Sequence, residues 1–210
     1  MGSCISKQTA ASTEDNVPAA PYALVIVGPS GVGKGTLISA LMTSDDPSPF
    51  AFSVSHTTRR PRDGEKDGVH YHFTSKSEFE SEIKAGKFIE HANVHGNIYG
   101  TSFAAVEAVS KSGRCCILDI DVQGARQVKA SSLKSMIVFI APPSLDELER
   151  RLRGRGTETD DEVTTRLANA RAEVESVDNE RELYNAVLTN GDFKTCLQEL
   201  RAVAAKALKG

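Results

Sequence analysis

The chain has 210 residues, a formal net charge of −3, 40% hydrophobic residues and 25% charged residues. This length suits one ordinary domain with a real core, and the charge argues against a generally basic nucleic-acid-binding protein. No apolar stretch reaches the ~20 residues needed to cross a bilayer. The four cysteines lack the spacing of a metal site, which favours buried thiols in a reducing compartment.

Residues 1–20 lack apolar periodicity and are predicted to form a flexible tail before a domain at 21–210. Gly2 and Ser6 match the N-myristoylation pattern, and Cys4 is available for palmitoylation. Under this hypothesis the protein is cytoplasmic and is attached to a membrane surface by its lipid. The alternative is that Met-Gly-Ser is a remnant of cloning, and the residues do not decide between the two.

The first motif with a chemical meaning is GPSGVGKGT at residues 28–36, which follows the apolar run YALVIV. A buried strand before it and a helix after it, running to Met42, are the setting of a phosphate-binding loop. Gly28 and Gly33 would let consecutive backbone N–H groups point at phosphate oxygens, at the positive end of the helix. Lys34 would add a point charge for the outer phosphates. The order of the glycines differs from that of the dinucleotide-binding fingerprint.

The hydroxyl residue of this loop is displaced by one position. Such loops normally carry Ser or Thr directly after the lysine, but here Gly35 follows Lys34 and Thr36 comes next. Gly35 would let the backbone approach the phosphates closely. We expect Thr36 to offer its hydroxyl to a phosphate and to leave Mg²⁺ to phosphate oxygens and water.

Residues 53–73, SVSHTTRRPRDGEKDGVHYHF, combine short β-prone segments with an arginine cluster. Arg59 and Arg62 flank a proline that stiffens the backbone, and arginine forms forked hydrogen bonds to phosphate. Tyr71 could donate its hydroxyl to the same group, which predicts a clamp for a second phosphate. The alternative is a solvated loop. Three nearby acidic residues favour it: Asp63, Glu65 and Asp67.

The segment FIEHANVHGNIYGTS at 88–102 is irregular and strand-like, between a helix with a Ser75–Glu78 capping box and a second helix that ends near Gly113. A carboxylate such as Glu90 can accept from the N1–H and the exocyclic amine of guanine, an edge that adenine lacks. Hydroxyls such as those of Ser55 and Thr101 can donate to O6. Taken singly, each of these residues is more often a surface or capping residue.

Three later runs are nearly continuous in apolar residues, which is typical of parallel strands covered on both faces. They are RCCILDID at 114–121, SMIVFIAP at 135–142 and AVLTN at 186–190. Helices are predicted between and after them, two of which open with capping boxes, Ser144–Glu147 and Thr159–Glu162. This alternation predicts an α/β protein with a parallel sheet.

The segment ERRLRGRGTETDDEVTTRL carries Arg151 and Arg155 four residues apart, on one helical face, and then Arg166. Fixed cations around a transferring phosphoryl group lower its barrier, so these arginines could serve phosphoryl transfer. A nucleic-acid patch is the rival interpretation. We reject it because residues 146–162 hold seven acidic residues against four arginines. The five histidines show no ligand spacing that would indicate a metal site.

In order and spacing, five of these motifs resemble the guanylate kinases, over residues 22–208: GPSGVGKGT, SVSHTTRRPRDGEKDGVHYHF, FIEHANVHGNIYGTS, CILDIDVQG and APPSLDELERRLRGRGTETDDEV. The resemblance implies a P-loop NTPase-type parallel sheet core, a small β-rich GMP-binding subdomain at about 53–102 and an arginine-rich helical lid at about 144–175. It also implies that the chain phosphorylates GMP with ATP and Mg²⁺ by direct in-line transfer. We expect dGMP to be accepted as well, because no residue of the sequence obviously reads the 2′-hydroxyl.

The same resemblance implies roles for individual residues. Guanine would be bound by Ser55, Glu90, Thr101 and Asp121, and the GMP phosphate by Arg59, Arg62, Tyr71 and Tyr99. The ATP phosphates would be bound by Ser30, Gly31, Val32, Gly33, Lys34, Gly35 and Thr36. The catalytic cations would be Lys34, Arg59, Arg151, Arg155 and Arg166. Asp119 would orient Mg²⁺ through water, and Asn190 would lie near the adenine, although Gly191 stands where the family commonly has an acidic residue.

Two other functions are alternatives to a guanylate kinase. A guanylate-kinase-like scaffold module binds phosphopeptides without catalysis, but such modules characteristically lose the phosphate-binding loop that this chain keeps. Another nucleoside monophosphate kinase is the third hypothesis, against which Glu90 and Asp121 favour guanine. The expected partners are GMP and ATP, with no nucleic acid, and the expected state is a monomer or a weak dimer.

Overall fold

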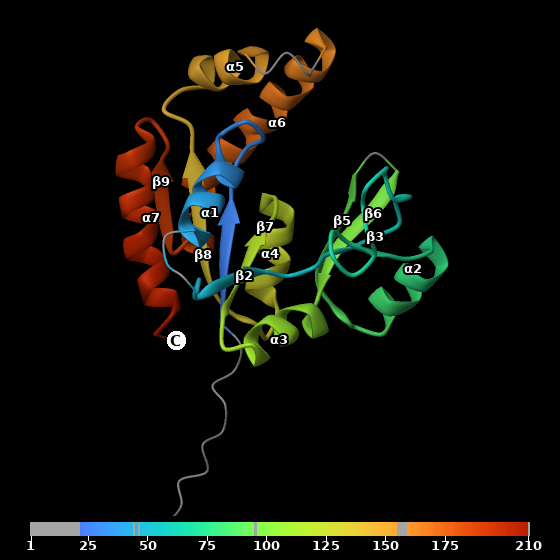
Figure 1. Ribbon diagram of the computed structural model, residues 1–210. Coiled ribbons are helices and arrows are strands. Elements are labelled where there is room, and N and C mark those ends of the chain that lie inside the picture. The colour runs from blue at the N-terminus through green and yellow to red at the C-terminus, as the bar shows by residue number, and fades with distance from the viewer. Residues whose placement is uncertain (1–21, 44, 46, 95, 155–158, 210) are drawn as a thin grey trace, which may run out of the picture.

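The computed structural model describes residues 22–43, 45, 47–94, 96–154 and 159–209. Its core is a five-stranded parallel sheet with the strand order β2-β7-β1-β8-β9, so the strand that leads into the glycine-rich loop lies in the centre (Figure 1). The strands are β1 (Tyr22–Val27), β2 (Phe50–Phe52), β7 (Cys115–Asp119), β8 (Lys134–Ala141) and β9 (Ala186–Thr189). The predicted parallel α/β core is therefore confirmed.

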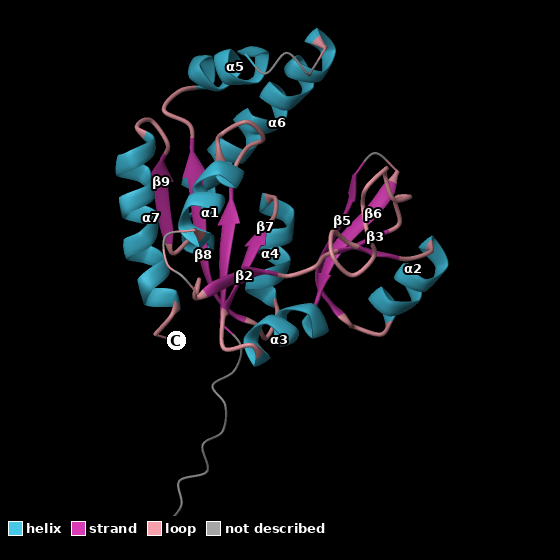
Figure 2. Cartoon of the chain, in the orientation of Figure 1, coloured by secondary structure: helices cyan, strands magenta, loops and turns pink. Residues whose placement is uncertain are grey.

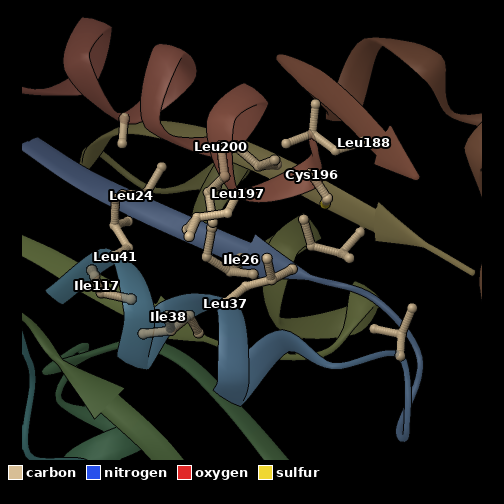
Figure 3. Close-up of a cluster of buried hydrophobic side chains, with 14 of the residues drawn as sticks. Leu24, Ile26, Leu37, Ile38, Leu41, Ile117, Leu188, Cys196, Leu197 and Leu200 are labelled. Carbon is tan, nitrogen blue, oxygen red and sulfur yellow. The ribbon is translucent and has the colours of Figure 1, made fainter. Parts of the chain in front are cut away.

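Both faces of this sheet are covered by helices, as the continuous apolar runs predict. Along β1, Leu24 and Ile26 face one buried cluster while Ala23 and Val25 face the other. The first cluster, part of which is shown in Figure 3, also draws on α1 (Lys34–Met42) and α7 (Phe193–Ala207). The second draws on α3 (Phe103–Lys111), α4 (Val122–Ala130) and the 3₁₀ turn η1 (Arg181–Leu183). This double burial fixes the sheet and hence the loops at its carboxyl edge.

A second, separate sheet is built from residues between 56 and 102, with the order β4-β3-β6-β5 (Figure 2). Its strands are β3 (His56–Thr57), β4 (His72–Phe73), β5 (Phe88–Val94) and β6 (Asn97–Ser102). The segment predicted to be irregular and strand-like forms an antiparallel hairpin of β5 and β6, whose register shifts between Phe88 and Glu90. Helix α2 (Lys76–Lys84) packs on this sheet through Phe79, whose ring stacks on Phe88 with centroids 4.3 Å apart.

Two helices, α5 (Leu145–Gly154) and α6 (Asp160–Asn179), lie beyond the carboxyl ends of the core strands (Figure 1). The predicted capping boxes form at Ser75–Glu78 and at Thr159–Glu162. At the start of α5, Ser144 Oγ accepts from the Glu147 backbone, but the Glu147 carboxylate binds Arg150 and Arg151 and so does not complete a box. The arginine-rich sequence thus competes with local capping.

Candidate functional site

The glycine-rich loop joins β1 to α1 and turns as predicted. Gly28 and Gly33 have φ values of 143° and 100°, and α1 begins at Lys34 with Gly33 as its N-cap. A Cβ atom at Gly33 would lie 2.6 Å from Asn190 Nδ2, whereas one at Gly35 would meet no atom within 4 Å. The described fold therefore demands glycine at 33 but not at 35, which leaves the close approach of a ligand as the reason for Gly35.

Lys34 lies beside an acidic residue from the neighbouring strand. Its Nζ donates to the Gly28 carbonyl at 2.6 Å and lies 3.8 Å from Asp119 Oδ1. Asp119 ends β7, whose register with β1 places Asp119 opposite Ile26 at the carboxyl edge. Burial raises the pKa of the Asp119 carboxyl, and the charge of Lys34 partly counteracts this shift. Parallel pairing thus brings together two charges that are 85 positions apart in the sequence.

One cavity, of about 450 Å³, opens between the loop and α5. Arg151 Nη2 donates to the Asn190 carbonyl at 2.9 Å, and Asn190 Nδ2 donates to the Val32 carbonyl at 2.8 Å. Arg166 of α6 reaches the loop at Ser30 Oγ, 2.5 Å away. The lining residues are Gly31, Val32, Gly33, Thr36, Arg150, Arg151, Gly154, Asn190, Gly191 and Phe193. Two predicted lid arginines therefore contact the loop, and Arg150 and Phe193 are lining residues that the sequence did not reveal.

A second cavity, also of about 450 Å³, lies between the carboxyl edge of β7 and the smaller sheet. It brings together Ser55, Tyr71, Thr101 and Asp119, four of the predicted site residues, from four different segments. Asp119 lines this cavity and pairs with Lys34, and Gly33 and Thr36 on either side of Lys34 line the first cavity, so the ion pair joins the linings of the two cavities.

Glu90 is a neighbour of Thr101, which lines the second cavity, but Glu90 is not itself among the lining residues. The two residues are cross-strand partners of β5 and β6, and they are 6% and 1% exposed. Burial raises the pKa of the Glu90 carboxyl, hydrogen bonding from Thr101 lowers it in part, and the charge of Asp121 raises it further. A Cβ atom at Gly124 would lie 3.2 Å from Glu90 Oε2, so a carboxylate is held tightly against α4.

Arg59 is held in place by a residue that the sequence indicated only as part of a solvated loop. The Glu65 carboxylate accepts from Arg59 Nη1 and Nη2 at 3.0 and 2.9 Å and from the Arg62 backbone N–H at 2.7 Å. These donors hold the pKa of Glu65 at about 2. The guanidinium carbon of Arg59 lies 5.4 Å from the centre of the Tyr71 ring. The spacing of Glu65, three residues after Arg62, was the one available signal.

The resemblance assigns Arg59 to the phosphate of the acceptor nucleotide, so replacing Glu65 by alanine is expected to raise KM for the acceptor about tenfold and to leave KM for the donor unchanged. Without Glu65, the Arg59 guanidinium is no longer held in one position. Steady-state kinetics with each substrate varied in turn would measure this. The exposed Asp63→Ala change in the same loop is the matched control. A lower acceptor KM in the Glu65 variant would show that Glu65 competes with phosphate and does not position Arg59.

Helix α4 connects the smaller sheet to the core. Gln127 Oε1 accepts from the His91 backbone N–H at 3.0 Å and its Nε2 donates to the His91 carbonyl at 2.9 Å, so one side chain continues the edge of β5. Asp121 is the N-cap of α4, and its Oδ1 accepts from the Gly124 N–H at 2.8 Å. The Gln127 link has no signal in the sequence, whereas Asp is a residue type that N-caps prefer.

Other predicted residues are not brought into these cavities. The side chain of Arg62 is exposed at the surface, Tyr99 contacts the Tyr71 ring at 6.0 Å, and Asp121 lines a third cavity. Arg155 lies outside the described residues, as do Gly2 and Cys4. Within the described part of the chain, no helix is both long and apolar enough to span a membrane.

Comparison with known proteins places these features in one family. The family model for guanylate kinase matches residues 20–207. The chain is 58% identical to a guanylate kinase 1 of Oryza sativa subsp. japonica over 178 residues, which are 85% of this chain and 46% of the rice protein. It is 44% identical to the guanylate kinases of Sus scrofa and Homo sapiens, and it covers 94% and 95% of their lengths.

Among solved structures, the guanylate kinase from Anaplasma phagocytophilum aligns with a TM-score of 0.62 at 30% identity, over 90% of this chain and 87% of that one. The chain thus spans about half the length of the rice relative and nearly all of the mammalian ones.

Proposed function

Because the chain belongs to the guanylate kinase family, we propose that it transfers the γ-phosphoryl group of ATP to GMP, and also to dGMP, giving ADP and the nucleoside diphosphate. The observation that carries this proposal is the Lys34–Asp119 pair between two cavities of similar volume. A phosphoryl transfer between two nucleotides needs such an arrangement, since donor and acceptor must approach one another from opposite sides.

The donor nucleotide occupies the cavity between the loop and α5. Its phosphates are bound by the loop from Ser30 to Thr36, and its base lies near Asn190, which already ties the end of β9 to the loop. Gly191 contributes no side chain there. The base of the donor nucleotide is therefore bound by stacking and by backbone groups. Phe193, which is 38% exposed, offers the largest apolar surface for stacking.

The acceptor nucleotide occupies the second cavity and extends past the end of β7 toward Asp121, at the edge of the third cavity. Glu90 accepts from the N1–H and amine of guanine, Ser55 and Thr101 serve O6, and Asp121 supports the amine through Oδ2, because its Oδ1 caps α4. Arg59, Arg62, Tyr71 and Tyr99 bind the phosphate. Three of these four residues already contact one another around the Tyr71 ring, which supports the assignment.

Transfer is in-line and direct. Lys34, Arg59, Arg151, Arg155 and Arg166 neutralise the charge that spreads over the moving phosphoryl group, and closure of α5 and α6 excludes water from it. Mg²⁺ binds through carboxylates and substrate phosphates, and Asp119 supplies a fitting carboxylate beside Lys34. We assign Asp119 to this ion through water and Thr36 to a phosphate. When bound, the ion neutralises phosphate charge.

A coupled assay of ADP release with GMP, dGMP, AMP, UMP and dTMP as acceptors tests the function. We expect rates with GMP and dGMP that exceed those with the other three by at least about 100-fold, because only guanine offers the donors that Glu90 requires. Equal rates with AMP would contradict the base assignment. No rate with any acceptor would favour a phosphopeptide-binding scaffold module.

The N-terminus supports a second, independent proposal. Gly2 becomes N-myristoylated and Cys4 palmitoylated, which attaches a cytoplasmic monomer or weak dimer to a membrane surface. Intact mass spectrometry of the protein from its natural source measures both the lipid and the oligomeric state. An unmodified Gly2 would end the lipid hypothesis without affecting the kinase.

A further inference from the structure

Glu173 is an acidic residue that no assigned role uses. It lies on α6, seven residues after Arg166, so two helical turns place both side chains on one face of the helix. That face brings Arg166 to the phosphate-binding loop at Ser30. Glu173 therefore belongs to the side of α6 that looks toward the catalytic edge of the sheet.

The carboxylate of Glu173 is incompletely satisfied. Its Oε2 is buried and has no hydrogen-bond partner among the residues that the structure describes. A buried acceptor without a partner costs free energy, and such an atom in a native fold calls for an explanation. A group that arrives with a substrate would supply the missing donor.

The residues around Glu173 restrict which chemical group can be that donor. It lines a cavity of about 280 Å³ between α4 and α6, together with Asp121, Gln123, Arg126 and Asn169. Burial raises the pKa of the Glu173 carboxyl, the charge of Lys34 lowers it in part, and the charge of Asp121 raises it further. Arg126 of the same lining is already paired with Glu180. A second negative group such as a phosphate would be repelled there, so a neutral donor fits better.

The proposed substrate carries suitable donors in this position. Lys34 stands at the transferred phosphate and Asp121 at the guanine, and the ribose joins these two parts of GMP. The ribose hydroxyls are neutral donors, and hydrogen bonds from them to a carboxylate are charge-assisted. We propose that Glu173 binds a ribose hydroxyl of the acceptor nucleotide. This inference rests on the proposed kinase function.

The test removes the Glu173 carboxylate and the ribose hydroxyl, first separately and then together. The kcat/KM at saturating ATP is measured for GMP, 2′-deoxy-GMP and 3′-deoxy-GMP with the wild type, Glu173→Leu and Glu175→Gln. Leucine has a similar volume and no acceptor, and Glu175 is an exposed carboxylate on the same helix. We expect Glu173→Leu to lose about tenfold with GMP and less than about twofold with the one deoxynucleotide that lacks the contacted hydroxyl.

If the substitution lowers kcat/KM for GMP but not for one of the two deoxynucleotides, the result supports the contact, and the hydroxyl missing from that nucleotide is the one contacted. A structural defect would instead lower kcat/KM equally for all three nucleotides. Thermal unfolding provides a second measurement. Leucine removes a carboxylate whose buried Oε2 has no partner among the described residues, so Tm is expected not to fall. Equal losses with all three nucleotides, or no loss with any, would overturn the ribose contact. Wild-type enzyme that does not phosphorylate GMP would instead overturn the kinase function itself.

Discussion

Replacing Lys34 by alanine is expected to lower kcat by about a thousandfold, because a fixed cation is lost where phosphoryl transfer develops negative charge. The side chain donates to the Gly28 carbonyl and pairs with Asp119, which lines the cavity proposed for the acceptor, while the loop around Lys34 lines the cavity proposed for the donor. No other described lysine joins these two sites. Initial rates of ADP release at saturating ATP and GMP measure the effect.

The fold should tolerate this change. Gly33 caps α1 through its backbone conformation, and the buried cluster below the loop is apolar, so neither depends on the ammonium group. We expect the free energy of unfolding to change by less than about 1 kcal/mol. The exposed Lys84→Ala change on α2 serves as the control for a lost charge. Turnover that survives in the Lys34 variant would mean that the loop does not hold the donor.

Replacing Glu90 by glutamine is expected to lower kcat/KM for GMP about 100-fold and to change KM for ATP less than about twofold. A buried carboxylate accepts two hydrogen bonds from guanine, whereas the amide presents one acceptor and turns a donor toward a donor. Glu90 is 6% exposed and is held between Thr101 and Gly124, so water cannot replace the lost bond.

The pH dependence of KM for GMP provides a second test of the role of Glu90. Burial raises the pKa of Glu90, and only the ionised carboxylate accepts from both guanine donors. As pH falls through that raised pKa, the carboxyl is protonated and KM for GMP rises; above it, KM is constant. The GMP phosphate also titrates near pH ~6, but it does so equally in Glu90→Gln. The difference between the two profiles therefore isolates Glu90.

The exposed Glu80→Gln change on α2 is the control for a lost carboxylate in the same part of the chain. Two results would contradict the assignment of Glu90 to the guanine base. One is a parallel pH profile of KM for GMP in wild type and Glu90→Gln, and the other is an equal loss of kcat/KM for GMP and for ATP.

The sequence by itself determined the parts of this protein that rest on local and periodic signals. Continuous apolar runs predicted the doubly covered parallel strands, because a strand buried on both faces has no polar side. The order of Gly28, Gly33 and Lys34 predicted the phosphate-binding loop, because backbone conformation and a following helix are enough to create it. Two capping boxes were also readable, since their bonds span three residues.

Only the tertiary structure decided which distant residues meet. Lys34 and Asp119 are neighbours because β1 and β7 are paired, and Glu90 is buried because β5 pairs with β6 and packs on α4. The anchoring of Arg59 by Glu65 argues against the alternative of a solvated loop, which the nearby acidic residues had favoured. The unpartnered oxygen of Glu173 has no sequence signal, because satisfaction of a buried acceptor depends on atoms from every element around it.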